Sequence, residues 1–234
     1  MIQLLREIRN ALVHLAYPHV CEGCGTDVLQ PDHRLCLVCL SNLPATHFQF
    51  YPNNPVEKIF WGRLPLHAAT AQYYFSRDSL IQRLMHQVKY RGNRDLAIYL
   101  GKRIGTALTG SNRFASVDVV VPLPLNPLKE RRRGYNQAAL LCEGISGQTG
   151  WPVSRNAVVR TSDTESQTRK NRIERWQNME GQFRVEDGRQ IRGKHILLVD
   201  DVVTTGATLE ACGHALLQEA GTRLSVASLC FSAH

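Results

Sequence analysis

The chain has 234 residues, of which 43% are hydrophobic, and carries a formal net charge of +8 with a pI near 9.3. This length suits one ordinary domain plus a small module, and the basic balance favours nucleic acid, anionic small molecules or anionic lipid as partners. No apolar run approaches the roughly 20 residues that span a bilayer, so no transmembrane segment is expected.

The N-terminus, residues 1–17, is predicted to form an amphipathic helix that Pro18 ends. Such a helix can pack on the rest of the chain, on a partner protein or on a membrane surface. Charged residues interrupt its hydrophobic pattern, so we expect no secretory signal and place the protein in the cytoplasm. The apolar positions at helical spacing are Leu4, Leu5, Ile8, Leu12 and Leu15.

Residues 18–50 contain two Cys-x-x-Cys pairs and are predicted to form a small zinc-binding module. Four thiolates complete a tetrahedral Zn²⁺ shell and leave no open position, so the expected site is structural rather than catalytic. Gly25 follows the second ligand, where such a turn often needs a left-handed backbone. A redox dithiol and an iron–sulfur cluster are the alternatives; disulfides are not expected, because the protein is placed in the cytoplasm and has an odd number of cysteines, seven. The candidate ligands are Cys21, Cys24, Cys36 and Cys39.

The segment 44–65 is rich in proline, asparagine and aromatic residues. It is predicted to be a linker that leaves the module and crosses the surface of the main domain, which we place at residues 51–234. A strand is expected at 67–75, and the spacing of apolar residues predicts helices at 80–90 and 94–108.

A buried strand is predicted at 117–121, followed by a turn with three prolines between residues 122 and 127. Proline fixes φ, so this turn should be extended and rigid. A strongly basic run from Lys129 to Arg133 comes next, before a helix that Asn136 can cap. The basic run can neutralise a bound diphosphate, or it can be a solvated turn.

A short strand at 157–160 precedes a long polar segment at 161–182 and a hairpin arm at 183–187. A polar insertion of this length between sheet strands is uncommon unless it has a function. We therefore expect the segment to contribute to a binding site.

The most informative stretch is KHILLVDDVVTTGAT, residues 194–208. Residues 196–199 are predicted to form a buried strand, Asp200 and Asp201 follow it, and a loop of threonine and glycine leads into a helix at 207–220. In an open α/β sheet, ligands bind outside the carboxyl ends of the strands, and a helix N-terminus there can bind an anion. Adjacent carboxylates suit two ribose hydroxyls or a hydrated Mg²⁺. The alternative, a strand with an acidic helix cap, explains neither the diacid nor the loop.

This stretch resembles the phosphoribosyl pyrophosphate (PRPP) signature of type I phosphoribosyltransferases, which has four hydrophobic residues, two acids and then a Thr-Gly-x-Thr loop. With a last strand at 224–231, the alternating pattern predicts an α/β fold with an open, mainly parallel sheet. The expected fold is therefore that of a type I phosphoribosyltransferase, preceded by a small four-Cys zinc module.

The whole chain, roughly residues 15–232, resembles the ComF family. The features that carry this resemblance are the four-Cys module, the basic Arg-Gly-Tyr-Asn-Gln turn, a polar segment with Gln167, Arg175 and Asn178, and the DDVVTTGAT motif. The resemblance implies a cytoplasmic protein of natural competence that handles imported single-stranded DNA, with a helicase-like or recombination protein as partner. An active phosphoribosyltransferase of nucleotide salvage, with an unknown acceptor, is the alternative.

The resemblance also implies roles for individual residues. Asp200 and Asp201 would hold the ribose of PRPP and organise Mg²⁺, and they are the candidate catalytic residues. Residues 161–182 would form a flexible hood that closes over the ligand. The implied phosphate-loop residues are Thr204, Thr205, Gly206, Ala207 and Thr208. The implied pyrophosphate-loop residues are Leu123, Pro124, Leu125, Lys129 and Arg133. The implied hood residues are Gln167, Arg169, Arg172 and Arg175.

One position departs from the pattern of the enzymes that act on 6-oxopurines. Those enzymes have an aspartate at the first residue of the phosphate loop, where this chain has Thr204. A hypoxanthine or guanine enzyme is therefore not expected. If turnover occurs, it would displace pyrophosphate at C1 of PRPP through an oxocarbenium-like state, in which the protein supplies positioning and charge stabilisation. Cys142, Cys212 and Cys230 are expected in the core.

Overall fold

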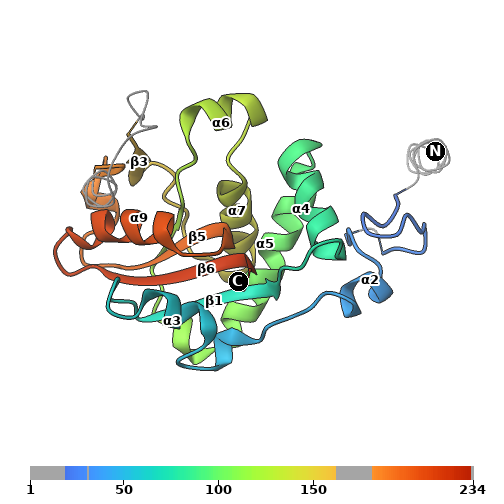
Figure 1. The fold of residues 1–234 in the computed structure, drawn as a ribbon, viewed down its shortest axis with the longest axis horizontal. Helices are drawn as coiled ribbons and strands as arrows, with labels where there is room; N and C mark the ends of the chain where they lie inside the picture. Colours follow the sequence, from blue (N-terminus) through green and yellow to red (C-terminus); the bar gives the residue numbers. More distant parts are fainter. Residues whose placement is uncertain (1–18, 31, 162–180, 233–234) are drawn as a thin grey trace, which may run out of the picture.

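A computed structural model describes residues 19–30, 32–161 and 181–232 (Figure 1). The helix predicted at 1–17 lies outside these ranges. The predicted hood residues Gln167, Arg169, Arg172 and Arg175 also lie outside them.

The main sheet has four parallel strands in the order β1-β6-β5-β2. A second sheet pairs two short strands in antiparallel fashion, as the predicted hairpin arm required. The expected α/β fold with a mainly parallel sheet is therefore confirmed. The strands are β1 (Ala68–Tyr74), β2 (Val119–Pro122), β3 (Val158–Arg160), β4 (Phe183–Val185), β5 (His195–Val203) and β6 (Arg223–Phe231).

Helices cover both faces of the main sheet (Figure 1). One buried cluster packs Leu84, Leu100 and Leu141 of three helices against one face, and a second cluster packs Phe60 and Leu216 against the other. The helices are α2 (Leu37–Ser41), α3 (Pro55–Phe60), α4 (Leu80–Tyr90), α5 (Arg94–Thr109), α6 (Pro127–Arg133), α7 (Gln137–Thr149) and α9 (Ala207–Leu217), with 3-10 turns at Phe48–Phe50, Asn112–Phe114 and Gly188–Gln190.

The segment predicted as a surface linker, 44–65, is more ordered than its composition suggested. It contains α3, whose Val56 and Phe60 are fully buried. Asn54 begins this helix: its Oδ1 accepts from the N–H of Val56, and its Nδ2 donates to the carbonyl of Ala69 in β1 at 2.8 Å. One buried amide thus ties the segment to the edge strand, a tertiary contact that composition does not reveal.

The basic run also differs from the prediction, because residues 127–133 form the short helix α6 rather than a turn. Asn126 caps this helix, Pro127 occupies its first turn, and Gly134 ends it in the left-handed region with φ 78°. The same sequence signals that were interpreted as turn residues are thus helix start and stop signals.

A buried histidine, His195, is the first residue of the inner strand β5. Its Nδ1 lies 2.9 Å from Ser116 Oγ and its Nε2 lies 2.8 Å from Ser225 Oγ, so both ring nitrogens have hydroxyl partners. Burial, with smaller contributions from the charges of His67 and Arg223, lowers the pKa of His195 to about 4. The neutral ring is therefore the form that the fold stabilises.

Stability should accordingly fall on acidification between about pH 6.5 and pH 4. In this window the unfolded state binds a proton at His195 and the native state does not, so the free energy of unfolding decreases by up to about 3 kcal/mol. Urea unfolding at a series of pH values checks this. His195→Gln should flatten the dependence in this window, whereas His214→Gln, at an exposed position, should leave it intact.

Candidate functional site

Two carboxylates, Asp200 and Asp201, lie inside β5 near its carboxyl end. The prediction that this strand ends at Val199 was wrong, because it pairs with β6 as far as Val203. Side chains alternate along a strand, and the two carboxylates are directed to opposite faces of the sheet. Asp201 contacts α4, while burial and then the charge of Asp200 raise the pKa of Cys212 in α9.

Asp201 already has a cationic partner, which the sequence did not reveal. Lys89 Nζ, from α4, lies 2.8 Å from Asp201 Oδ2, and both side chains are largely buried. Burial raises the pKa of Asp200 well above its ordinary value, the charge of Asp201 raises it further, and Lys89 partly offsets this. Asp200 also accepts a hydrogen bond from the backbone N–H of Asp201. Asp201 is thus an ionised acceptor paired with Lys89, whereas the environment of Asp200 favours the protonated carboxyl group.

The loop after β5 presents three exposed threonine hydroxyls beside the start of α9. These belong to Thr204, Thr205 and Thr208. Gly206 precedes the helix with φ 73°, and no side chain caps the first turn. The free N–H groups of such a turn, together with the helix dipole, favour an anion at this position. Arg63 fixes the loop by donating from Nη1 to the carbonyl of Thr205 at 3.0 Å.

Gly206→Ala should destabilise this loop. A left-handed backbone costs an L-residue about 1–2 kcal/mol, and an added Cβ would lie 2.7 Å from both Ile59 Cγ2 and Phe60 Cε1. We expect the free energy of unfolding to fall by about 2–3 kcal/mol in denaturant titrations. The control, Gly147→Ala, adds a Cβ in open space on α7 and should be neutral or slightly stabilising.

The proline-rich loop after β2 lies next to the diacid in the sheet. Pro122 pairs with Val199 of β5, and the N–H of Leu123 donates to the carbonyl of Val199 at 2.8 Å. Asn136 caps α7 as predicted, and its Nδ2 donates to the carbonyl of Leu123 at 3.0 Å. The phenol of Tyr135 donates to the carbonyl of Val88, which joins the same turn to α4.

Of the two predicted cations near this loop, Arg133 is oriented by neighbours and Lys129 is exposed. Arg133 Nη1 donates to Gln137 Oε1 at 2.7 Å, and its guanidinium lies 5.7 Å from the ring centroid of Tyr90. Lys129 lies on the exposed side of α6. The structure therefore brings Leu123 beside the diacid and places the two cations on the helix that follows.

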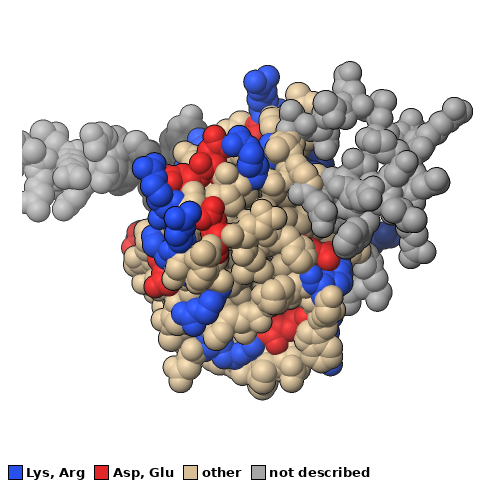
Figure 2. Space-filling view, turned by 90° about the vertical axis from the view of Figure 1, so that its left-hand side faces the viewer, with Lys and Arg blue, Asp and Glu red and all other residues tan. Residues whose placement is uncertain are grey.

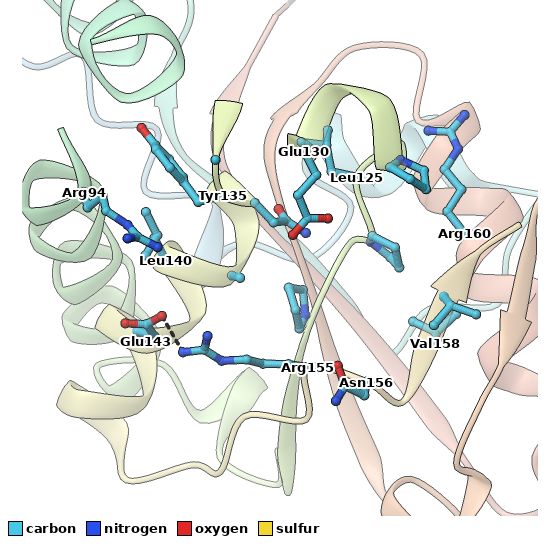
Figure 3. Close-up of a pocket in the computed structure, with 17 residues that line it drawn as sticks. Arg94, Leu125, Glu130, Tyr135, Leu140, Glu143, Arg155, Asn156, Val158 and Arg160 are labelled. Atoms are coloured by element: carbon cyan, nitrogen blue, oxygen red, sulfur yellow. Dashed lines mark hydrogen bonds and ion pairs between the residues drawn. The ribbon is translucent and has the colours of Figure 1, made fainter. Parts of the chain in front are cut away.

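A cavity of about 400 Å³ adjoins the same loop (Figure 3). Pro124 and Leu125 form part of its wall, opposite Val158 of β3. An ion pair between Arg155 and Glu143 crosses one side of it. The cavity therefore offers guanidinium, carboxylate and apolar groups to a small polar ligand. The polar side chains around it are Arg94, Glu130, Tyr135, Asn136, Glu143, Arg155, Asn156 and Arg160.

The four predicted cysteine ligands converge on one point. Their sulfur atoms all lie within 4.8 Å of one another, and Cys24 Sγ lies 3.7 Å from Cys36 Sγ. A tetrahedral zinc site with bonds of about 2.3 Å has edges of about 3.8 Å, so the cluster fits this ion. Burial alone would raise the pKa of Cys21, but backbone N–H groups, led by that of Cys36, lower it to about 6. The four thiols can therefore bind a metal ion such as zinc.

This four-Cys module packs against α4. Gly23 lies so close that an added Cβ would be 2.7 Å from Cys39 Sγ and 3.1 Å from Leu80 Cδ1. Gln87 Nε2, on the same helix, donates to the carbonyl of Glu22 at 2.8 Å. Gly25 has the predicted left-handed backbone, with φ 78°. The other three cysteines, Cys142, Cys212 and Cys230, are fully buried, as expected for core residues.

The surface at the other end of the sheet has mixed charges. In Figure 1 the strands point away from this side, and Figure 2 shows basic and acidic side chains interspersed over it. Ion pairs account for much of this arrangement, including Arg189 with Asp187 and Arg192 with Glu219. The predicted site lies at the opposite end, where the strands terminate.

Comparison with known proteins identifies the family. The chain is 37% identical over 214 residues to the competence protein ComFC of Bacillus subtilis, with 86% of this chain and 85% of that protein covered. The chain belongs to the ComF family. This ComF protein is also 30% identical to the DNA utilization protein YhgH of Escherichia coli O157:H7 (90% and 89% covered) and 28% identical to competence protein F of Haemophilus influenzae (84% and 83% covered).

The phosphoribosyl transferase domain family matches residues 150–234 of this ComF protein. The matched segment contains the diacid and the threonine-glycine loop at 204–208, whereas the proline-rich loop precedes it. Together with the parallel sheet, this match identifies the fold as that of type I phosphoribosyltransferases. Among the helices that the structure describes, none combines the length and the apolarity that crossing a membrane requires.

Proposed function

We propose that this ComF protein binds PRPP with Mg²⁺ and acts in natural transformation on imported single-stranded DNA. The observation that carries the first part is the arrangement around the end of β5, where Asp200, Asp201 and the uncapped N-terminus of α9 meet. Carboxylates suit ribose hydroxyls and Mg²⁺, and a free helix N-terminus suits the 5-phosphate.

Each part of the site then has a role that its chemistry supports. Residues 204–208 bind the 5-phosphate through backbone N–H groups and threonine hydroxyls. Residues 123–125, with Lys129 and Arg133, bind the pyrophosphate. Asp200 and Asp201 bind the ribose and help to hold Mg²⁺, so Asp201 exchanges Lys89 for the ligand. Gln167, Arg169, Arg172 and Arg175 belong to the hood that covers the ligand.

Calorimetric titration of the purified protein with PRPP tests this proposal. We expect saturable binding of one PRPP per chain in the presence of Mg²⁺, and weaker binding when EDTA removes the metal, since the carboxylates then face the anionic ligand directly. Pyrophosphate alone should bind more weakly than PRPP, because it reaches only one of the two anion sites. Absence of binding at millimolar PRPP with Mg²⁺ would refute the proposal.

Two observations support a role in DNA handling rather than in salvage. Related proteins are named for competence and for DNA utilization, and the chain carries a net charge of +8. Such a role places the protein in the cytoplasm, where single-stranded DNA enters, with a competence helicase or recombination protein as partner. The thiol cluster then holds a structural zinc ion within a module at residues 18–50, and the phosphoribosyltransferase-like domain occupies residues 51–234.

A further inference from the structure

The outer face of α4 displays a row of cationic and aromatic side chains. Arg83, His86, Tyr90 and Arg91 are spaced by three, four and one residues, which places them along one side of a helix. All four are exposed, and Tyr90 is 60% exposed. A large exposed ring among cations is a feature that packing of this chain does not explain.

The two arginines of this row have no carboxylate partner. In the described parts of the chain, neither Arg83 nor Arg91 forms an ion pair, and the same holds for Arg131 and Arg132 of the neighbouring α6. The arginines that do pair with carboxylates lie elsewhere: Arg34, Arg63, Arg113, Arg155, Arg184, Arg189 and Arg192. Arg83 and Arg91 on α4, and Arg131 and Arg132 on α6, therefore present positive charge that a polyanion can neutralise.

A groove of about 230 Å³ runs along this row, between α4 and the four-Cys module. Arg83, His86 and Arg91 line one wall, and the backbone of Gly23 lies on the other. One acidic residue, Glu22, also lines the groove, where the two arginines outnumber it. The four-Cys module thus contributes a wall to a cationic groove.

Two neighbouring members of the row are aromatic. The rings of His86 and Tyr90 lie 4.8 Å apart between centroids at an angle of 44°, and the guanidinium of Arg133 lies 5.7 Å from the Tyr90 centroid. An exposed ring flanked by cations is the usual platform for an unstacked nucleobase, and such contacts tolerate any base. The helices that carry these residues, α4 and α6, are neighbours in Figure 1.

We infer that the α4 track, defined as Arg83, His86, Tyr90 and Arg91, is a binding site for single-stranded nucleic acid. Phosphates occupy the groove beside the four-Cys module, and a base stacks on Tyr90. A single strand fits because its bases are free to leave the stack, whereas a duplex keeps them paired. This inference rests on the proposed DNA role and assigns it to a defined surface. Lys89, adjacent to Tyr90 in sequence, places the track next to the diacid.

Fluorescence anisotropy with a labelled oligothymidylate of about 16 nucleotides tests the assignment. Arg83→Gln with Arg91→Gln should weaken binding and reduce the slope of log affinity against log salt by about 1.4, since each lost contact to a single strand contributes about 0.7. Tyr90→Ala should weaken binding about tenfold without changing that slope. Tyr90→Phe, which keeps the ring, should bind with the affinity of the wild type. The full-length protein is used throughout.

The matched control removes the same charge from the opposite end of the sheet. Arg189→Gln with Arg192→Gln changes two exposed arginines and should leave affinity and slope unchanged. Three results would each overturn the inference. The control variant could lose as much affinity for the oligonucleotide as the track variants, the track variants could bind it as tightly as wild type, or a poly-glutamate peptide could bind as tightly as the oligonucleotide. Calorimetry with PRPP accompanies each variant: unaltered PRPP binding separates failure of the track from failure of the PRPP site, and unaltered melting excludes misfolding.

Discussion

Replacing Asp200 and Asp201 together by asparagine should weaken PRPP–Mg²⁺ binding by about a hundredfold or more. The carboxylates would supply charge-assisted hydrogen bonds and metal contacts, and each such bond contributes about 1.5–3 kcal/mol. The substitution also leaves Lys89 without its partner, which places an unpaired cation where the ribose should bind. Calorimetry of wild type and variant measures the difference directly.

The control for this experiment is Asp187→Asn. Asp187 pairs with Arg189 on the surface at the amino ends of the strands, so its replacement changes the charge without touching the site. The free energy of unfolding of each variant is measured in parallel, since loss of binding is informative only for a folded protein. Equal PRPP affinity in wild type and the diacid variant would show that the ligand binds elsewhere.

Removing the metal from the four-Cys module should have the largest effect on stability. Four thiols this close repel as thiolates, and binding of a structural zinc ion provides about 10 kcal/mol or more of folding free energy in isolated modules. We expect one zinc per chain by elemental analysis and none in Cys36→Ser, with a lower melting temperature. Cys36 also caps α2, because its sulfur accepts from the N–H of Cys39.

A second cysteine variant separates metal loss from general destabilisation. Cys142 is fully buried in α7, far in sequence from the module, and Cys142→Ala should lower stability by about 1–2 kcal/mol while retaining zinc. A Cys36→Ser protein that keeps its zinc would contradict the assignment of the ligands. Iron in place of zinc would identify the cluster as the alternative considered from the sequence.

The parts of this protein that local sequence determines were predictable. The four cysteines, the cap at Asn136 and the strand–loop–helix of residues 194–208 depend on spacing and on turn chemistry within about twenty residues. The structure shows each of these local features: the sulfur atoms converge, Asn136 caps α7, and Gly206 adopts the left-handed backbone before α9. Alternation of strands and helices then predicted the parallel sheet.

Contacts between distant segments were not predictable, and they changed the description of the site. Lys89 lies near the end of the helix predicted at 80–90, yet it reaches Asp201 across 112 positions because α4 packs over the face to which Asp201 points. The segment 44–65 looked like a linker, yet Asn54 and Phe60 dock it on the sheet. Neither contact can be recognised from a local sequence pattern, because each depends on which helix covers which face of the sheet.

Helix α4 has fixed contacts in several directions at once. Leu80 packs near Gly23 of the four-Cys module, Gln87 bonds to Glu22, and Lys89 pairs with Asp201. Each residue of an α-helix turns its successors by about 100°, so one inserted residue after Leu80 would rotate Lys89 away from the diacid and Tyr90 off the outer face. An insertion or deletion within α4 would therefore disturb the four-Cys module, the diacid and the outer face together, so the number of residues in this helix is fixed by its contacts.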